Sequence, residues 1–225
     1  MKLFIKKSIA FFLICAMFSL GGCKSSFNSL EYVEAILDLS FQGDGTKALQ
    51  VEEDVEKEDL EETYELFVTQ FVEDYIASGL DADDEYRELF GKEIKKIFQT
   101  MRYHVKTGKK IDENQYEVTV EITPQDVFVR YNEELAADSK KMQEKIESGF
   151  YSENQEEKEE QIQREILYRS LELLKIAASN SEYSETEEVN LRVHKNDDGK
   201  YEIEEQDLSE LVVKILKLDE LITGN

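Results

Sequence analysis

Apolar side chains recur at three- and four-residue intervals over long stretches of the chain, which predicts helices with one buried face. The first such stretch covers about residues 29–42. Asn28 and Glu31 fit a capping box at its start, and Gly43 suits the left-handed conformation that ends a helix. Two more helices are predicted at about 56–78 and 84–101.

Other segments alternate apolar and polar residues, and this pattern predicts half-buried β-strands. The alternation places Tyr103 and Thr107 on the buried side of a first strand. A turn at 108–110 then leads to a partner strand at 116–122, which Pro124 ends. A second pair of strands is predicted at 189–193 and 201–203, joined by a tight turn at 196–199.

Residues 125–180 return to a helical pattern in two pieces, separated at Gly149. Their apolar faces predict an αα-hairpin, and coiled-coil pairing with a partner is an alternative use of the same faces. A last helix is expected to open with a second capping box at Asp207 and Glu210. The fold class is therefore α+β: N-terminal helices packed in a curved antiparallel sheet of about four strands, an inserted helical hairpin and a C-terminal helix.

The first 22 residues have the features of a signal peptide. Residues 1–7 carry three lysines and no acid, and residues 8–20 form an uncharged apolar run that is too short to span a bilayer. Leu20-Gly21-Gly22-Cys23 then resembles the lipobox of bacterial lipoproteins. The resemblance implies cleavage between Gly22 and Cys23 and acylation of the Cys23 thiol. Alternatives are an ordinary secretory signal and an uncleaved anchor.

Cleavage would leave three parts: a removed segment at 1–22, a lipidated tether at 23–28, and one α+β domain at 29–225 with the helical insertion at about 125–180. Cys15 would be lost, so Cys23 would be the last cysteine, and neither a disulfide within the chain nor a cysteine metal site is expected. The expected location is the cell membrane, lipid-anchored on its extracytoplasmic face.

The charge of the chain argues against several partners. The formal net charge is −24, and removal of Lys2, Lys6 and Lys7 with the signal peptide takes it to −27. Such an acidic protein is not expected to bind nucleic acid, because phosphate contacts require clustered basic residues. The charge also favours a body that is repelled from an anionic lipid surface and stands away from it.

Three stretches together resemble a family of Gram-positive bacterial lipoproteins that is known only as a domain of unknown function. They are 32–38 running into 41–44, the strand ending Glu121-Ile122-Thr123-Pro124, and 197–203. The order of elements also resembles the cystatin-like folds related to nuclear transport factor two. That resemblance implies a cone-shaped pocket between sheet and helices, although the insertion at 125–180 departs from the minimal fold. No catalytic residues come with the family.

The sequence contains few groups that suggest a reaction. His104 and His194 are the only histidines, and both fall on the polar side of predicted strands, so the two are expected to face solvent. Asp81 begins an acidic run, but an EF-hand loop starting there would need Gly and Glu where Tyr86 and Lys92 stand. Asp83 or Asp84 fits a helix N-cap better. The glutamates of 153–160 fit a solvated helix start.

No catalytic residue, cofactor or metal site is therefore predicted. The favoured function is a non-enzymatic surface lipoprotein that binds an envelope protein or a small ligand, with membrane lipid as its partner through Cys23. The alternative is an enzyme or small-molecule binder that uses the cone-shaped pocket. A solute-binding subunit of a transporter is a third and less favoured possibility, because such proteins are usually larger and two-lobed.

Overall fold

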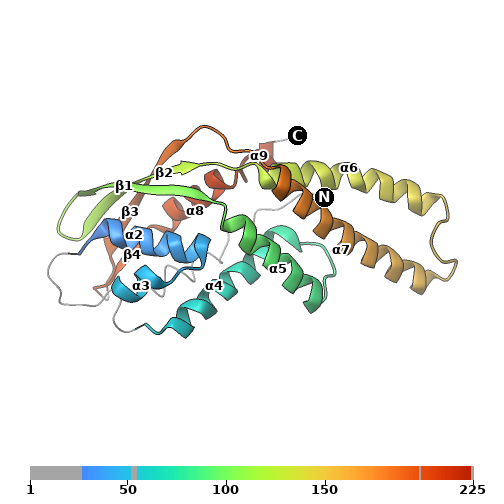
Figure 1. Cartoon of the computed structure of the whole chain (residues 1–225), viewed down its shortest axis with the longest axis horizontal. Helices are drawn as coiled ribbons and strands as arrows, with labels where there is room; N and C mark the ends of the chain where they lie inside the picture. Colours follow the sequence, from blue (N-terminus) through green and yellow to red (C-terminus); the bar gives the residue numbers. More distant parts are fainter. Residues whose placement is uncertain (1–26, 52–54, 198, 224–225) are drawn as a thin grey trace.

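The computed structural model describes residues 27–51, 55–197 and 199–223. A mixed body of helices and sheet forms one end of the molecule, and a long helical hairpin projects from it (Figure 1). The body contains α2 (Ser29–Leu37), α3 (Thr46–Val51), α4 (Lys57–Phe71), α5 (Asp84–Phe98), the sheet, and α8 (Glu205–Ile215). The hairpin consists of α6 (Val127–Glu147) and α7 (Gln155–Asn180), and the short α9 (Glu220–Thr223) packs near α6.

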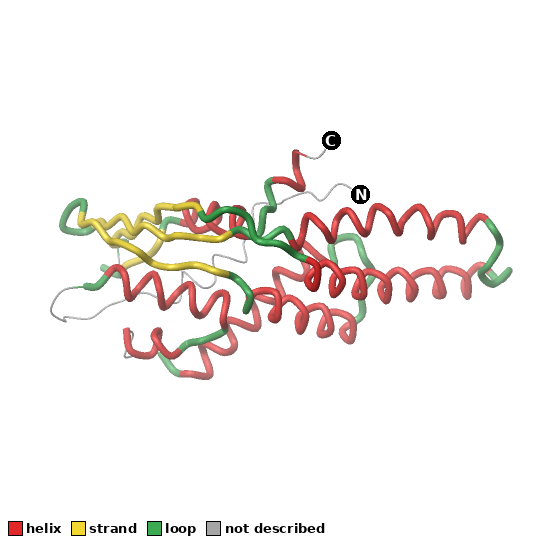
Figure 2. Tube along the Cα trace, turned by 45° about the horizontal axis from the view of Figure 1, so that its top comes forward, coloured by secondary structure: helices red, strands yellow, loops and turns green. Residues whose placement is uncertain are grey.

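The sheet has four antiparallel strands in the order β1-β2-β3-β4, which confirms the predicted α+β class. Figure 2 shows these strands together at one end of the molecule. The α6–α7 hairpin interrupts the chain between β2 and β3, as expected for the insertion at 125–180. The strands are β1 (Arg102–Lys110), β2 (Gln115–Thr123), β3 (Glu187–Lys195) and β4 (Tyr201–Ile203).

The predicted turn at 108–110 is wrong, because these residues belong to β1. The register shifts between Val105 and Thr107, so that Val105 faces Val120 and Thr107 faces Thr119. Such a bulge adds one residue and reverses the side of every residue after it. Thr107 and Gly108 are both exposed, but Gly108 lies on the side of α2, where an added Cβ would lie 2.8 Å from Ser29 Oγ. Gly108 therefore allows α2 to pack closely against β1, and it does not form a turn.

The N-terminal helices are confirmed, and two of them end in π-turns. Asn28 caps α2 by accepting hydrogen bonds from the backbone of Leu30 and Glu31. The helix then widens into a π-turn over Asp38–Gln42 before Gly43, which has a φ of 66°. A second π-turn, Val72–Ile76, follows α4 in the same way.

The capping box predicted at Asp207 and Glu210 is wrong. The N-cap of helix α8 is Glu204, three residues before Asp207, and Asp207 lies inside the first turn of the helix. The Asp207 carboxylate instead accepts hydrogen bonds from the backbone N–H of Arg192 (2.8 Å) and from its guanidinium (2.8 and 2.7 Å). Beyond the three residues of β4, Asp207 and the backbone N–H of Glu204 therefore satisfy the backbone N–H and C=O of Arg192 at the β3 edge.

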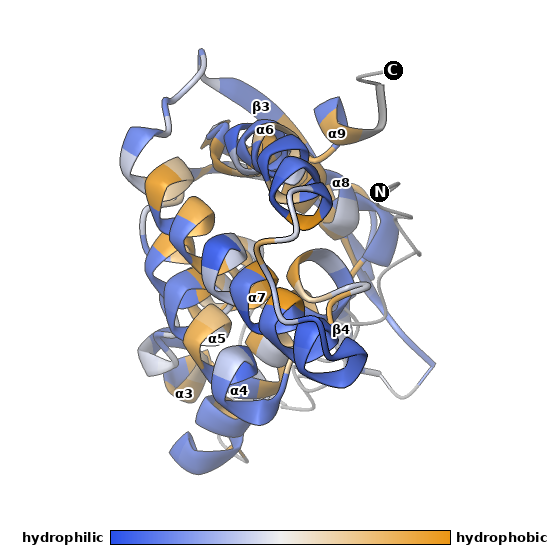
Figure 3. Cartoon of the chain, turned by 90° about the vertical axis from the view of Figure 1, so that its right-hand side faces the viewer, coloured by the Kyte–Doolittle hydropathy of each residue, from blue (hydrophilic) through white to orange (hydrophobic). Residues whose placement is uncertain are grey.

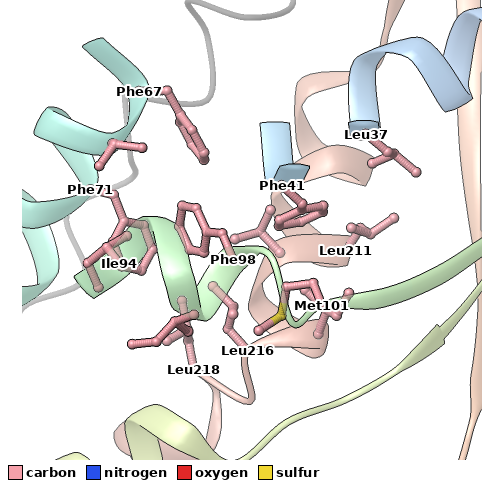
Figure 4. Packing of buried hydrophobic residues seen from close by; sticks show 14 of the residues in the cluster. Leu37, Phe41, Phe67, Phe71, Ile94, Phe98, Met101, Leu211, Leu216 and Leu218 are labelled. Carbon is pink, nitrogen blue, oxygen red and sulfur yellow. The ribbon is translucent and has the colours of Figure 1, made fainter. Parts of the chain in front are cut away.

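The space between the sheet and helices α4 and α5 is filled with side chains, in the place where a cone-shaped pocket was expected. Phe98 lies at the centre of this packing (Figure 4), with its ring centroid 5.0 Å from Phe71, 5.6 Å from Phe67 and 6.0 Å from Phe41. Leu211 and Leu216, from α8 and the residue that follows it, are fully buried in the same core.

The α6–α7 hairpin confirms the predicted pairing of the two helices. The C-terminal part of α7 also packs against α5, and buries Leu171 and Leu174. Farther out, the outward sides of both helices are hydrophilic (Figure 3). Within the described parts of the chain, no helix combines the length and hydropathy that crossing a membrane requires.

Candidate functional site

The predicted lipidation and cleavage residues, Cys23 and Gly22, lie outside the described residues. The two histidines are described, and the structure does not bring them together. His104 on β1 is exposed and faces Glu121, whereas His194 on β3 faces Gln115 at the other end of β2. The Nε2 of His194 lies 3.0 Å from Glu202 Oε1. No shared site exists between the two histidines.

The acidic runs act as helix starts. Asp83 caps α5 by accepting a 2.9 Å hydrogen bond from the backbone of Tyr86. Asn154 caps α7, and Glu156 and Glu157 occupy its first turn, where acids complement the helix dipole. Among residues 27–51, 55–197 and 199–223, no three His, Cys, Asp or Glu side chains are grouped so that they could hold a metal ion.

A polar groove lies along the outer edge of the sheet, between β1 and the helical segment 29–42. It is open to solvent and has a volume of about 410 Å³. Its helical wall is formed by Glu34, Asp38 and Gln42, which follow one another at four-residue spacing and so share one face. Its other wall is the stretch from Met101 to Val105.

A network of four side chains holds the two walls together. Asp38 is central, because its Oδ1 accepts a 2.7 Å hydrogen bond from the Tyr103 hydroxyl and its Oδ2 lies 2.8 Å from Lys47 Nζ. Lys47 also lies 2.9 Å from Glu34 Oε1. The network therefore links α2, its π-turn, α3 and β1 beside the groove.

Local features of the sequence position these groups. The Ser40 hydroxyl donates to the carbonyl of Ile36 (2.6 Å), a side-chain bond that competes with the regular helical ladder where the π-turn forms. After Gly43, Asp44 accepts a 2.9 Å hydrogen bond from the backbone of Thr46 and opens α3. The chain thus reverses its direction directly after this turn, which brings Lys47 into contact with the acids of the preceding helix. π-turns often occur at functional sites.

The electrostatics of the network favour a fixed set of charges. Burial, together with the negative charge of Asp38, raises the pKa of Tyr103, so the phenol remains a hydrogen-bond donor. Burial acts to lower the pKa of Lys47, but its hydrogen bonds to Asp38 and Glu34 outweigh this and raise it. Because both Asp38 oxygens are already engaged, the arrangement suits recognition better than proton transfer.

The edge of β1 is protected along one half only. In the half from 106 to 110, the bulge and three lysines (Lys106, Lys109 and Lys110) are the devices that prevent strand pairing at an exposed edge. The half from 102 to 105 has neither a bulge nor a lysine, and it forms one wall of the groove. Within the described residues no strand pairs with this edge, and the groove lies beside it.

Sequence reasoning did not find this site. The one local signal was the acidic and amide stripe of Glu34, Asp38 and Gln42 beside the apolar face of the first helix. Tyr103 is 65 positions from Asp38, and nothing in its strand pattern indicated that its hydroxyl reaches an acid.

Comparison with known proteins supports the fold. No protein-family model matches the chain, and no curated protein matches it. Among solved structures, it is similar to ycdA from Bacillus subtilis subsp. subtilis strain 168, a protein classed as a candidate lipoprotein, with 17% sequence identity and a TM-score of 0.56. The match covers 84% of this chain and 56% of that one, so the chain spans little more than half the length of its neighbour. At this identity the likeness concerns the fold alone.

Proposed function

We propose that this protein is a lipid-anchored, extracytoplasmic binding module, held in the membrane by acylation of Cys23, which binds its partner in the groove beside β1. The lipobox-like segment Leu20-Gly21-Gly22-Cys23 supports the anchor. The fold likeness to a candidate lipoprotein agrees with it. Two acyl chains give stable anchoring, because each buried CH₂ contributes about 0.8 kcal/mol.

The unprotected half of the β1 edge is the observation that carries the binding role. An extended peptide can add to such an edge as a new strand, and the neighbouring helix then supplies contacts for its side chains. Here the helical wall offers Glu34, Asp38 and Gln42, and the strand wall offers the exposed His104. The Arg102 guanidinium already stacks on the Tyr183 ring, 3.7 Å from its centroid. We therefore expect the partner to contribute an extended segment that carries charged or polar side chains.

The anchor is tested by metabolic labelling with a palmitate analogue in a bacterial host. The wild-type chain is expected to take up the label and to fractionate with membranes. The variant Cys23→Ala is expected to lose the label and to appear in the soluble fraction. Equal labelling of both chains would contradict acylation at Cys23.

The groove is tested by placing a photo-crosslinking amino acid at either of two positions of β1 in living cells. At His104, in the open half, we expect adducts of defined mass with a single species. Lys109 is the matched control, since it is exposed on the same strand but lies in the protected half. Identical adducts at both positions, or none at His104 in a membrane-bound chain, would rule out the groove as the binding site.

A further inference from the structure

Phe27 is fixed to the body by a cluster of aromatic rings, here called the Phe27 cluster: Phe27, Tyr32, Tyr116 and Tyr201. The Phe27 ring stacks on Tyr201 with centroids 3.6 Å apart, and lies 5.2 Å from Tyr116 and 5.4 Å from Tyr32. The Tyr32 hydroxyl donates a 2.8 Å hydrogen bond to the carbonyl of Tyr201. Aromatic pairs of this kind contribute about 0.5–1.5 kcal/mol each beyond their buried area.

The Phe27 cluster lies at the end of the sheet where both β-hairpin turns occur. The ammonium groups of Lys110 and Lys195 lie 6.0 and 5.3 Å from the ring centroids of Tyr116 and Tyr201. Lys195 also donates its backbone N–H to Asn114 in the β1–β2 turn, at 2.9 Å. Ile111, in that turn, is 47% exposed. The tip of the α6–α7 hairpin lies at the opposite end of the molecule (Figures 1 and 2).

The chain between the anchor and the Phe27 cluster is very short. Cys23 and Phe27 are four residues apart. Even a fully extended chain therefore spans no more than about 14 Å between their Cα atoms. Electrostatic interactions are screened over a length of about 8 Å at physiological ionic strength. The tether therefore prevents the body from moving far beyond the distance over which the charge of the membrane surface acts.

We propose that the hairpin end of the sheet is the surface that rests on the lipid bilayer, with the partly exposed members of the Phe27 cluster (Phe27, Tyr116 and Tyr201) and with Lys110, Ile111 and Lys195, whereas Tyr32 is buried beneath them. This inference rests on the proposed acylation of Cys23. Tyrosine rings and lysine side chains suit the headgroup level, because both combine an apolar body with a polar tip. Acids in the two turns (Asp112, Glu113 and Asp197) occur at the same end. The surface is therefore of mixed charge and rests at headgroup level.

This orientation differs from the one that net charge alone suggests. A charge of −27, which remains once Lys2, Lys6 and Lys7 leave with the signal peptide, favours repulsion from anionic lipid. The short tether holds the hairpin end at the surface in spite of that charge, and the repulsion acts instead on the rest of the body. The α6–α7 hairpin, in which α6 alone is about 30 Å long at 1.5 Å per residue, then projects away from the membrane.

The test uses the full lipidated chain in vesicles of phosphatidylcholine and phosphatidylglycerol that contain a headgroup nitroxide. Single cysteines are introduced as Ile111→Cys or Phe150→Cys and carry a fluorophore. Labelling is specific, because Cys15 leaves with the signal peptide and the Cys23 thiol is acylated. We expect quenching at position 111 to be severalfold stronger than at 150. Adding Phe27→Ser to the Ile111→Cys chain should weaken its quenching, because the end of the tether then loses its ring contacts with the hairpin end and no longer fixes the orientation of the body.

Mass spectrometry of the same samples measures acylation separately. An unacylated chain would overturn the proposed anchor, whereas an acylated, vesicle-bound chain with weak quenching at both positions would overturn only the orientation. Equal strong quenching at 111 and 150 would show a body lying flat, and would also overturn it. A chain in which Phe27→Ser leaves the quenching unchanged would show that the Phe27 cluster does not hold the orientation.

Discussion

The sheet-containing body and the outer part of the α6–α7 hairpin are stabilised by different interactions. In the body, residues from helices and strands that are distant in sequence contribute to one apolar core, and many of these side chains are fully buried. In the outer hairpin, from about residue 135 to 166, burial is sparse and involves Asp138, Met142 and Tyr151. Polar pairs join the two helices there, as between Lys145 and Glu165, and Asp138 also accepts a 3.2 Å hydrogen bond from the Nε of Arg169, nearer the body.

This difference shows how the molecule can combine a rigid fold with a projecting element. Apolar burial is cooperative and insensitive to pH, and it fixes the walls of the groove beside β1. Partly exposed ion pairs contribute less and respond to pH and salt. We therefore expect the body to unfold as one unit, and the outer hairpin to open locally at a lower free energy.

The largest expected effect follows from removing the side chain at the centre of the body. Phe98→Ala should lower the free energy of unfolding by about 3–5 kcal/mol, because it leaves a cavity that the neighbouring rings cannot move to fill. The measurement is urea unfolding followed by circular dichroism. The groove should loosen with the core, since Phe41, which contacts Phe98, lies in the π-turn that carries Asp38.

The matched control is Phe150→Ala, the same substitution at the hairpin tip. Phe150 is 68% exposed, so the change in unfolding free energy should stay within about 0.5 kcal/mol. Comparable losses of unfolding free energy in the two variants would contradict the division into an apolar core and a polar outer hairpin.

The same division explains which parts of the fold were predictable. Periodicity identified the longer helices and the strands, because burial on one side produces a regular local pattern, but it did not predict the short helices α3 and α9. It failed at β1, where a bulge changes the register and needs β2 and α2 to specify it. Gly108 looked like a turn residue, but its role depends on Ser29, far away in the sequence.

Long-range polar contacts were the other source of error. Asp207 has the local features of a helix cap, yet Arg192 offers it a stronger, charge-assisted set of hydrogen bonds. The groove was missed for the same reason. Glu34 and Asp38 are two among 51 acids, and only the fold shows that Lys47 and Tyr103 reach them. Local patterns do not specify which distant groups will meet.

The smaller expected effect concerns the tip of the hairpin. Glu165 accepts hydrogen bonds from Lys145 (2.6 and 2.7 Å) and from the Tyr151 hydroxyl (2.9 Å). The bond from Lys145 lowers the pKa of Glu165, against an opposing effect of burial. Because the pKa of Glu165 is lower in the folded state, the stabilisation is fully present above the pKa of glutamate in the unfolded state, about 4.3. It is lost as the pH falls through the pKa of Glu165 in the folded state.

Glu165→Gln should therefore speed hydrogen exchange at the hairpin tip at neutral pH, while leaving exchange in the sheet and the global unfolding midpoint unchanged. Glutamine keeps the size and one acceptor oxygen, so the difference reports the loss of charge. As the pH is lowered below about 4, exchange at the tip of the wild-type chain, corrected for intrinsic rates, should approach that of the variant. If the variant instead unfolds globally at a lower denaturant concentration, the outer hairpin is part of the cooperative core, and the contrast with the body does not hold.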